Sequence, residues 1–226
     1  MLKIVDYPDF STLSQALASK WLTLVANTPV DQPCSFALAG GTTPAPLYRQ
    51  FDVLFAVAKS RPIQLLATDE RWVPDSDPQS NEGLFRHCFS QSTGQWNLLS
   101  LKNDQPDPAS AIPEIHARLQ ENCNHPFNAV ILGMGADGHI ASLFPNAPQL
   151  LIEDSSVDCV AATHPQTQQA RISLSFSRLL KTQSIWLVIT GAEKHTVLKN
   201  AINSSASPIG ALLAAAKCDV EVFWCP

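Results

Sequence analysis

Basic residues, long apolar segments and paired cysteines are all scarce in this sequence. Its 226 residues include 15 Lys and Arg against 20 Asp and Glu, a net charge of −5, with no basic run interleaved with aromatics. A nucleic-acid surface is therefore not expected. No apolar stretch approaches the roughly 20 residues of a membrane span, and the first ten residues lack the cationic and apolar segments of a secretory signal. We expect a cytoplasmic protein that binds neither nucleic acid nor membrane.

Several catalytic motifs are absent as well. The six cysteines are scattered without a CxxC pair, which favours a reducing compartment over a disulfide framework in a chain of this size. No HExxH motif or local Cys/His cluster supplies three zinc ligands, and the GxSxG elbow of many serine hydrolases is missing. We expect no required metal, no cofactor and no cysteine nucleophile.

What the sequence does contain is an alternation of two apolar patterns. With 45% apolar residues, residues 1–226 suffice for one α/β domain with a substantial core. Strand-like runs alternate with segments of helical periodicity, which indicates a mostly parallel sheet covered on both faces. The expected strands are Leu2–Val5, Ser35–Ala39, Ile63–Ala67, Trp96–Leu101, Ala129–Gly133, Ser156–Ala162, Arg171–Ser175, Ile185–Thr190 and Val220–Trp224. The expected helices are Phe10–Ala26, Pro44–Ala58, Asn81–Phe89, Ala109–Asn122, Glu193–Ile202 and a last one that begins at Ser207 and Pro208.

The segment Ile131–Pro145, ILGMGADGHIASLFP, is the most informative part of the chain. An apolar strand runs into a turn that holds three glycines, an acid and a histidine. Gly133, Gly135 and Gly138 let main-chain N–H groups approach an anion closely. His139 adds an imidazole that can move protons near neutral pH. Read alone, the pattern also fits a tight connection with a solvated histidine, because loose glycine patterns are common.

A second strand end carries three consecutive charged residues. The apolar run Ile63–Ala67 leads to Asp69, Glu70 and Arg71. Open parallel sheets bind ligands at the carboxyl ends of their strands. These side chains are therefore candidates for the same site as His139.

A third segment, Phe36–Tyr48 (FALAGGTTPAPLY), repeats the arrangement. Its strand is followed by Gly40, Gly41, Thr42 and Thr43. Pro44 suits the first turn of a helix, and Thr43 is the expected N-cap. Free N–H groups, hydroxyls and the positive end of a helix make this turn a phosphate cradle by physical type.

Together, the three segments resemble the 6-phosphogluconolactonase family. The family's phosphate loop is similar to Ala39–Pro44, its DER–VP–SN block to Asp69–Asn81 and its GMG-DGH-ASLFP block to Gly133–Pro145. Weaker similarities follow at Arg171–Ser175 (RISLS), Gly191–Lys194 (GAEK) and Ser207–Leu212 (SPIGAL), so the resemblance covers most of the chain. The departures are small: Ala39 and Thr42 stand where many relatives carry serine.

The resemblance implies a fold, a substrate and a mechanism. The family's fold is a three-layer αβα arrangement with a modified doubly wound, mostly parallel sheet, shared with sugar-phosphate isomerases and deaminases. The implied substrate, 6-phospho-D-glucono-1,5-lactone, is an activated ester, for which a base and water suffice. We expect His139 to take the proton of the attacking water and to return it to the departing ring oxygen. Either Asp69 or Asp137 would orient the imidazole, and we favour Asp69.

Positive charge is needed at the substrate phosphate and at the developing oxyanion. The family motifs select Arg71, Arg171 and Lys194 for these two places without assigning them, and each is alternatively an ordinary surface ion pair. The catalytic candidates are thus His139, Asp69 and Arg71. The substrate-binding candidates are Gly40, Gly41, Thr42, Thr43, Asn81, Gly135, Asp137, Arg171 and Lys194, of which Asn81 is alternatively a helix cap.

Two other functions remain open at this point. A glucosamine-6-phosphate deaminase shares the implied fold, but its turn continues with an acid-containing A-F-N-E-P type sequence where this chain has ASLFP. A non-catalytic sugar-phosphate-binding protein would need the phosphate loop but no proton-transfer group such as His139. We expect the small phosphorylated lactone to be the partner, and a monomer.

Overall fold

Seven parallel strands form the main sheet within the described residues, 1–58, 61–146 and 157–226 of the computed structural model. Their spatial order is β1-β10-β9-β6-β2-β3-β5. The strands are β1 (Leu2–Asp6), β2 (Ser35–Leu38), β3 (Ile63–Ala67), β5 (Trp96–Leu98), β6 (Ala129–Leu132), β9 (Ser184–Thr190) and β10 (Asp219–Cys225). The predicted α/β class with a mostly parallel sheet is confirmed.

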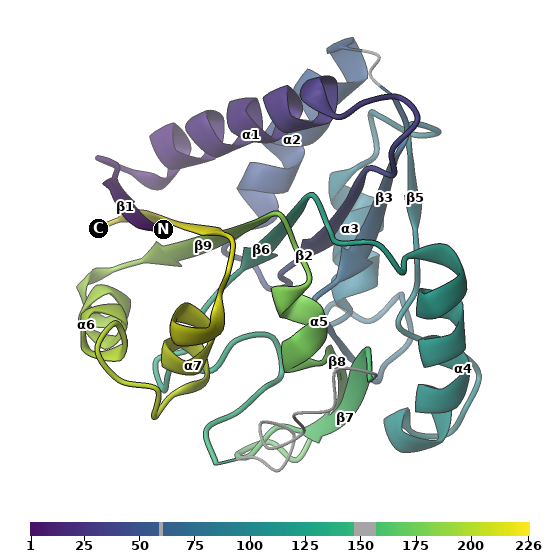
Figure 1. The fold of residues 1–226 in the computed structure, drawn as a ribbon. Helices are drawn as coiled ribbons and strands as arrows, with labels where there is room; N and C mark the ends of the chain where they lie inside the picture. Colours follow the sequence, from purple (N-terminus) through teal and green to yellow (C-terminus); the bar gives the residue numbers. More distant parts are fainter. Residues whose placement is uncertain (59–60, 147–156) are drawn as a thin grey trace.

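Helices cover both faces of this sheet (Figure 1). They are α1 (Phe10–Asn27), α2 (Ala45–Ala58), α3 (Asn81–Cys88), α4 (Pro108–Asn122), α5 (Phe176–Leu180), α6 (Ala192–Ala201) and α7 (Pro208–Ala215). Helices α1 and α2 pack together on one side, while α5, α6 and α7 lie on the other. None of the described helices is long and apolar enough to cross a membrane.

Local chemistry explains where several helices begin. The side chain of Asp9 accepts a hydrogen bond from the N–H of Thr12 at 2.7 Å, and Ser207 accepts one from Gly210 at 3.3 Å, with Pro208 as the first helical residue. Such caps satisfy N–H groups that lack an intrahelical partner. The expected start of the last helix is confirmed.

The expected cap of α2 is wrong. Helix α2 begins at Ala45, and the first helical hydrogen bond runs from the N–H of Tyr48 to the carbonyl of Pro44 at 3.1 Å. Pro44 thus takes the cap position, one residue beyond Thr43. A proline serves there because its missing N–H costs the helix nothing.

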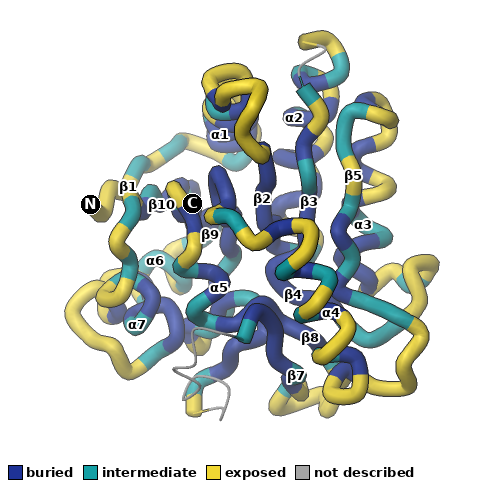
Figure 2. The backbone as a smooth tube through the Cα atoms, turned by 45° about the vertical axis from the view of Figure 1, so that its right-hand side comes forward, coloured by how far each residue is buried: buried dark blue, intermediate teal, exposed yellow. Residues whose placement is uncertain are grey.

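The core lies between the sheet and its helices, where the inner strands β2, β3, β6 and β9 are buried along most of their length (Figure 2). The edge strands β1 and β5 are more exposed. Trp21 of α1 stacks on Phe51 of α2 with ring centroids 3.8 Å apart, and Phe36 of β2 packs against the same indole at 5.2 Å. Large side chains of this kind each contribute about 1.5–3 kcal/mol when fully buried. They fix α1 and α2 on the sheet and thereby fix the start of α2.

A second, smaller sheet was not expected. It is antiparallel, in the order β4-β8-β7, and consists of β4 (Asp69–Arg71), β8 (Ala170–Leu174) and β7 (Cys159–Thr163). The expected strands Ser156–Ala162 and Arg171–Ser175 therefore correspond to this sheet and not to the main one; Ser156 itself lies outside the described residues. The cause is a contact between distant segments, because Asp69–Arg71 pairs with Arg171–Ser173.

One expected strand is shorter and one helix was not expected. Strand β5 ends at Leu98 instead of Leu101, since the chain then turns and the N–H of Leu101 donates to the carboxylate of Glu82 at 2.7 Å. The short helix α5 was not expected, because its five residues are too few to show a helical period.

Candidate active site

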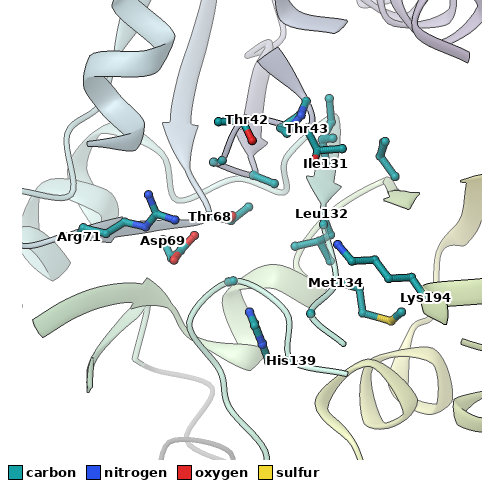
Figure 3. A pocket seen from close by; sticks show the side chains of 18 of the residues that line it. Thr42, Thr43, Thr68, Asp69, Arg71, Ile131, Leu132, Met134, His139 and Lys194 are labelled. Atoms are coloured by element: carbon teal, nitrogen blue, oxygen red, sulfur yellow. The ribbon is translucent and has the colours of Figure 1, made fainter. Parts of the chain in front are cut away.

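The candidate site lies where the strand order of the main sheet reverses. Strands β2 and β6 are neighbours, and the chain moves outward from them in opposite directions, to β3 and β5 on one side and to β9 and β10 on the other. A crevice opens at the carboxyl ends of the strands at such a point. There the structure contains a pocket of about 350 Å³ (Figure 3). Its walls come from the turns that follow β2, β3 and β6, from strands β4 and β8 of the small sheet, and from the start of α6 after β9.

The turn after β2 forms one wall. Ala39–Pro44 all line the pocket, and α2 begins immediately behind them. Gly41 has a φ of +90°, a conformation that favours glycine. Gly40 is needed for a different reason, because a Cβ there would lie 1.8 Å from Oδ1 of Asn81. The positive end of a helix and a closely packed glycine turn make this wall suited to an anion.

The turn after β6 presents His139 on another wall. Its Nδ1 lies 2.6 Å from Oδ1 of Asp137, and its backbone N–H donates to the same oxygen at 3.1 Å. A Cβ on Gly135 would lie only 2.2 Å from that Nδ1. The ring also packs against Phe144, with centroids 4.9 Å apart. The imidazole is thus in contact with Asp137 and Phe144 and remains partly exposed, at 27%.

The charge of Asp137 is stabilised by this arrangement. Burial by itself raises the pKa of Asp137, but the backbone N–H and the imidazole of His139 outweigh it, so that the pKa lies below its usual value. We favoured Asp69 as the carboxylate that orients His139, and that expectation is wrong. Asp137 holds this position because the tight turn brings it back onto the ring.

Asp69 instead joins the histidine turn to the small sheet. Its Oδ2 accepts a hydrogen bond from Oγ of Ser142 at 2.5 Å and lies 3.7 Å from Nη1 of Arg171. The amide of Asn81 donates to its backbone carbonyl at 2.7 Å. Asp69 still lines the pocket and is only 6% exposed. It is therefore placed to position Arg171 and the segment that carries Ser142.

Arg71 and Arg171 form a cross-strand pair. They occupy directly opposite positions in the antiparallel ladder of β4 and β8, so their side chains share one face of the ribbon, and both line the pocket. Burial lowers the pKa of Arg171, while Asp69 counteracts this effect. Like charges directly opposite each other destabilise a sheet. A bound anion would relieve that repulsion.

Lys194 adds a third cation. It lies in the first turn of α6, after Gly191 with a φ of +85°. In Figure 3 its side chain extends along the wall formed by Leu132 and Met134, on the side of the pocket away from Arg71. A chain with a net charge of −5 therefore concentrates three cations around one pocket, which favours an anionic ligand.

Unpaired polar atoms also gather here. Among the described residues, buried side-chain atoms without a hydrogen-bond partner include Oγ1 of Thr68, Oδ1 of Asn81 and Nε of both Arg71 and Arg171. Three of these four residues line the pocket, and Asn81 lies directly behind Gly40. Unpaired buried polar atoms are costly. Their clustering indicates that this region is built for a polar ligand.

The structure brings most of the predicted site residues to the pocket. Ten of them line it: Gly40, Gly41, Thr42, Thr43, Asp69, Arg71, Gly135, His139, Arg171 and Lys194. Asn81 and Asp137 were expected to bind substrate, but they lie behind Gly40 and His139 and support them. Nor is Asn81 the cap of α3, since Ser80 holds that position and accepts from the N–H of Gly83 at 3.0 Å.

Sequence reasoning missed Ser142 and the role of Glu70. Ser142 is fully buried and connects to Asp69 across 73 positions of sequence, a contact that no local pattern signals. Glu70 is also fully buried, and its carboxylate accepts hydrogen bonds from the N–H groups of Asn81 and Glu82 at 2.8 and 2.7 Å. In hindsight, its alternation with Asp69 and Arg71 along an extended segment was a usable signal.

No group of three or more His, Cys, Asp or Glu side chains in the described part of the chain is placed to hold a metal ion.

The family model for glucosamine-6-phosphate isomerases/6-phosphogluconolactonase matches residues 8–224. The chain belongs to this family. It is 36% identical to the 6-phosphogluconolactonase of Caulobacter vibrioides over 195 residues, which cover 84% of this chain and 82% of that protein. It is 31% identical to the 6-phosphogluconolactonase of Mesorhizobium japonicum over 226 residues, 97% of this chain and 94% of that protein.

Solved structures agree with this membership. The crystal structure of a 6-phosphogluconolactonase from Shewanella baltica OS155 superposes with a TM-score of 0.89 at 30% identity, over 100% of this chain and 98% of that one. A monomeric glucosamine-6-phosphate deaminase gives a TM-score of 0.78 at 18% identity, over 97% and 96% of the two chains. The second likeness is one of fold alone. It confirms the expected relation to the deaminase fold.

Proposed function

We propose that this enzyme hydrolyses 6-phospho-D-glucono-1,5-lactone to 6-phospho-D-gluconate, the lactone hydrolysis of the oxidative pentose phosphate pathway, with His139 as the base. The single observation that carries the mechanism is the hydrogen bond between Asp137 and Nδ1 of His139 at the edge of a pocket that also holds three cations. The relatives named 6-phosphogluconolactonase support the reaction.

The Asp137 contact sets the tautomer of His139. An ionised carboxylate only accepts hydrogen bonds, so Nδ1 carries the proton and Nε2 is left as the basic nitrogen. Nε2 takes a proton from water as the water oxygen attacks the lactone carbonyl carbon. Asp137 then stabilises the imidazolium. When the bond from that carbon to the ring oxygen breaks, the imidazolium returns the proton to the ring oxygen.

A histidine base supported by one carboxylate is sufficient for a lactone. A positioned general base contributes about 10²–10⁴-fold, which is enough for an ester that is already reactive. Gly135 makes the geometry possible, because any side chain there would displace the ring. Asp69, held by Ser142 and Arg171, acts as a positioning residue and not as the base.

The cross-strand pair Arg71 and Arg171 binds the substrate phosphate together with the turn Gly40–Thr43. A phosphate dianion offers acceptors to both guanidinium groups and to the N-terminal end of α2. Lys194 contributes further positive charge from the opposite wall. Six free cysteines, five of them buried, support a reducing, cytoplasmic location.

Three measurements test the proposal. Purified protein should accelerate the hydrolysis of freshly generated lactone above the spontaneous rate, and His139→Ala should lose most of that activity while keeping its fold. Glucosamine 6-phosphate should release no ammonia, which separates this enzyme from a deaminase. A sugar-phosphate-binding protein without activity would bind the product but leave the lactone rate at background, and that result would refute the proposal.

A further inference from the structure

Two glutamines connect the cross-strand arginines through a chain of hydrogen bonds. Nη1 of Arg71 donates to the backbone carbonyl of Gln79 at 2.6 Å. Nη2 of Arg171 donates to Oε1 of Gln169 at 3.3 Å. The two glutamine side chains then meet, with Nε2 of Gln169 donating to Oε1 of Gln79 at 2.8 Å. We call Gln79 and Gln169 the glutamine bracket.

The bracket joins two segments that are far apart in sequence. Gln79 lies in the loop between β4 and α3, one residue before the cap residue Ser80, and Gln169 immediately precedes β8. The ribbon continues between them, since the N–H of Trp72 donates to the carbonyl of Ala170 at 2.9 Å. The two segments are therefore linked twice, by the main-chain hydrogen bond from Trp72 to Ala170 and by the side-chain hydrogen bond from Gln169 to Gln79.

The two arginines need such support because they repel each other. They are opposite residues of an antiparallel ladder with the same charge. Neither Nε has a hydrogen-bond partner among the described residues. An arginine side chain also loses much rotational freedom when it is fixed for binding. The oxygen atoms of Gln79 and Gln169 accept hydrogen bonds from the guanidinium groups. These bonds offset the charge repulsion and restrict the rotation of the two side chains before any ligand binds.

We propose that Gln79 and Gln169 are positioning residues that hold the two guanidinium groups in register for a phosphate group. This inference rests on the proposed function, in which Arg71 and Arg171 bind the substrate phosphate. The bracket does not touch the reacting atoms. It reduces the ordering that binding has to impose on the arginines, which is how preorganisation raises affinity.

The expected signature is a change in phosphate affinity without a change in turnover. Loss of a side chain that contributed only to folding would not change phosphate affinity while leaving turnover constant. Inorganic phosphate, used as a competitive inhibitor, reports on the phosphate subsite alone. The Michaelis constant KM for the lactone and the inhibition constant Ki for phosphate should therefore rise together, while kcat stays constant.

The test uses nearly isosteric replacements, so that packing is preserved. Gln169→Met removes both of its hydrogen bonds and should raise KM and Ki about three- to tenfold, as expected for one or two net hydrogen bonds. Gln79→Met removes only the bond between the glutamines and should have a smaller effect. Gln50→Met, on α2, is the matched control, because Gln50 is a half-buried glutamine that does not line the pocket.

The double variant tests whether the two residues act as a unit. Gln169→Met already breaks the bond to Gln79, so adding Gln79→Met should raise Ki no further. The inference is overturned if both single variants leave Ki within twofold of the parent, if their effects multiply, or if kcat falls while Ki is unchanged. Arg171→Met separates this failure from that of the proposed function. If Arg171→Met leaves Ki for phosphate unchanged, Arg171 does not bind the substrate phosphate and that part of the proposed function is wrong. If Arg171→Met raises Ki strongly while the glutamine variants do not, only the positioning role of Gln79 and Gln169 is wrong.

Discussion

Replacing Gly135 with alanine should slow the enzyme by moving His139. The added Cβ would lie 2.2 Å from Nδ1 and 2.3 Å from Cε1 of His139, and 2.6 Å from Oδ1 of Asp137. Ordinary carbon contacts begin near 3.4 Å, so the imidazole has to retreat by about 1 Å. A displacement of this size costs on the order of 100-fold in rate when a catalytic group must meet its substrate in a fixed geometry. We expect kcat to fall by about that factor while KM changes little.

The assay is lactone hydrolysis corrected for the spontaneous rate, with thermal unfolding measured on the same preparations. The key control is the double variant Gly135→Ala/His139→Ala. With the imidazole removed there is no ring to displace, so the added methyl group should cost nothing beyond His139→Ala alone. Near-parental turnover of Gly135→Ala, or a further loss in the double variant, would refute the link between Gly135 and the histidine.

Three other predictions concern the rest of the site. Asp137→Asn should lower kcat by about 10²–10³-fold. The same carboxylate should affect stability, because the pKa of Asp137 in the folded state lies below its ordinary value of 3.8. Its contribution to stability is present above that pH and is lost as the pH falls through the lowered pKa. Urea unfolding from pH 6 to pH 2 should show the gap between parent and variant closing at the acid end, and a constant gap would contradict the argument. Gly40→Ala should destabilise the fold by about 1–3 kcal/mol, because its Cβ would clash with Asn81 at 1.8 Å; an unchanged melting temperature would show that the turn adapts. Exhaustive chelation, checked by elemental analysis, should leave activity intact; loss of activity that returns with a stoichiometric divalent ion would make His139 a candidate ligand instead of the base.

The centre of the main sheet was predictable because strands such as β2 and β6 are buried on both faces. Runs such as Ala129–Leu132 are apolar at every position, and that continuity distinguishes a central parallel strand. The small sheet was not predictable in the same way. The three residues of β4 have no apolar period of their own, and they are extended because β8 pairs with them across about 100 positions of sequence.

The composition of the site was predictable to the extent that its residues sit in local motifs. Gly40, Gly135 and His139 lie at strand ends, and the parallel topology brings strand ends together. Which carboxylate orients His139 depended on the path of the turn. Asp137 reaches Nδ1 only because Gly138, with a φ of +81°, folds the chain back. Such a conformation is permitted by a glycine but not specified by it.

The consecutive residues Asp69, Glu70 and Arg71 show how one strand serves both the ligand and its support. Successive side chains of a strand point to opposite faces, so Asp69 and Arg71 line the pocket while Glu70 points away from it. There its carboxylate binds Oγ of Ser80 and the N–H groups of Asn81 and Glu82, at the start of α3. An anion at the N-terminus of a helix is stabilised by the helix dipole. That contact fixes Asn81, and Asn81 in turn packs behind Gly40. Glu70 therefore supports the pocket wall at Gly40 through Asn81, without reaching the pocket itself.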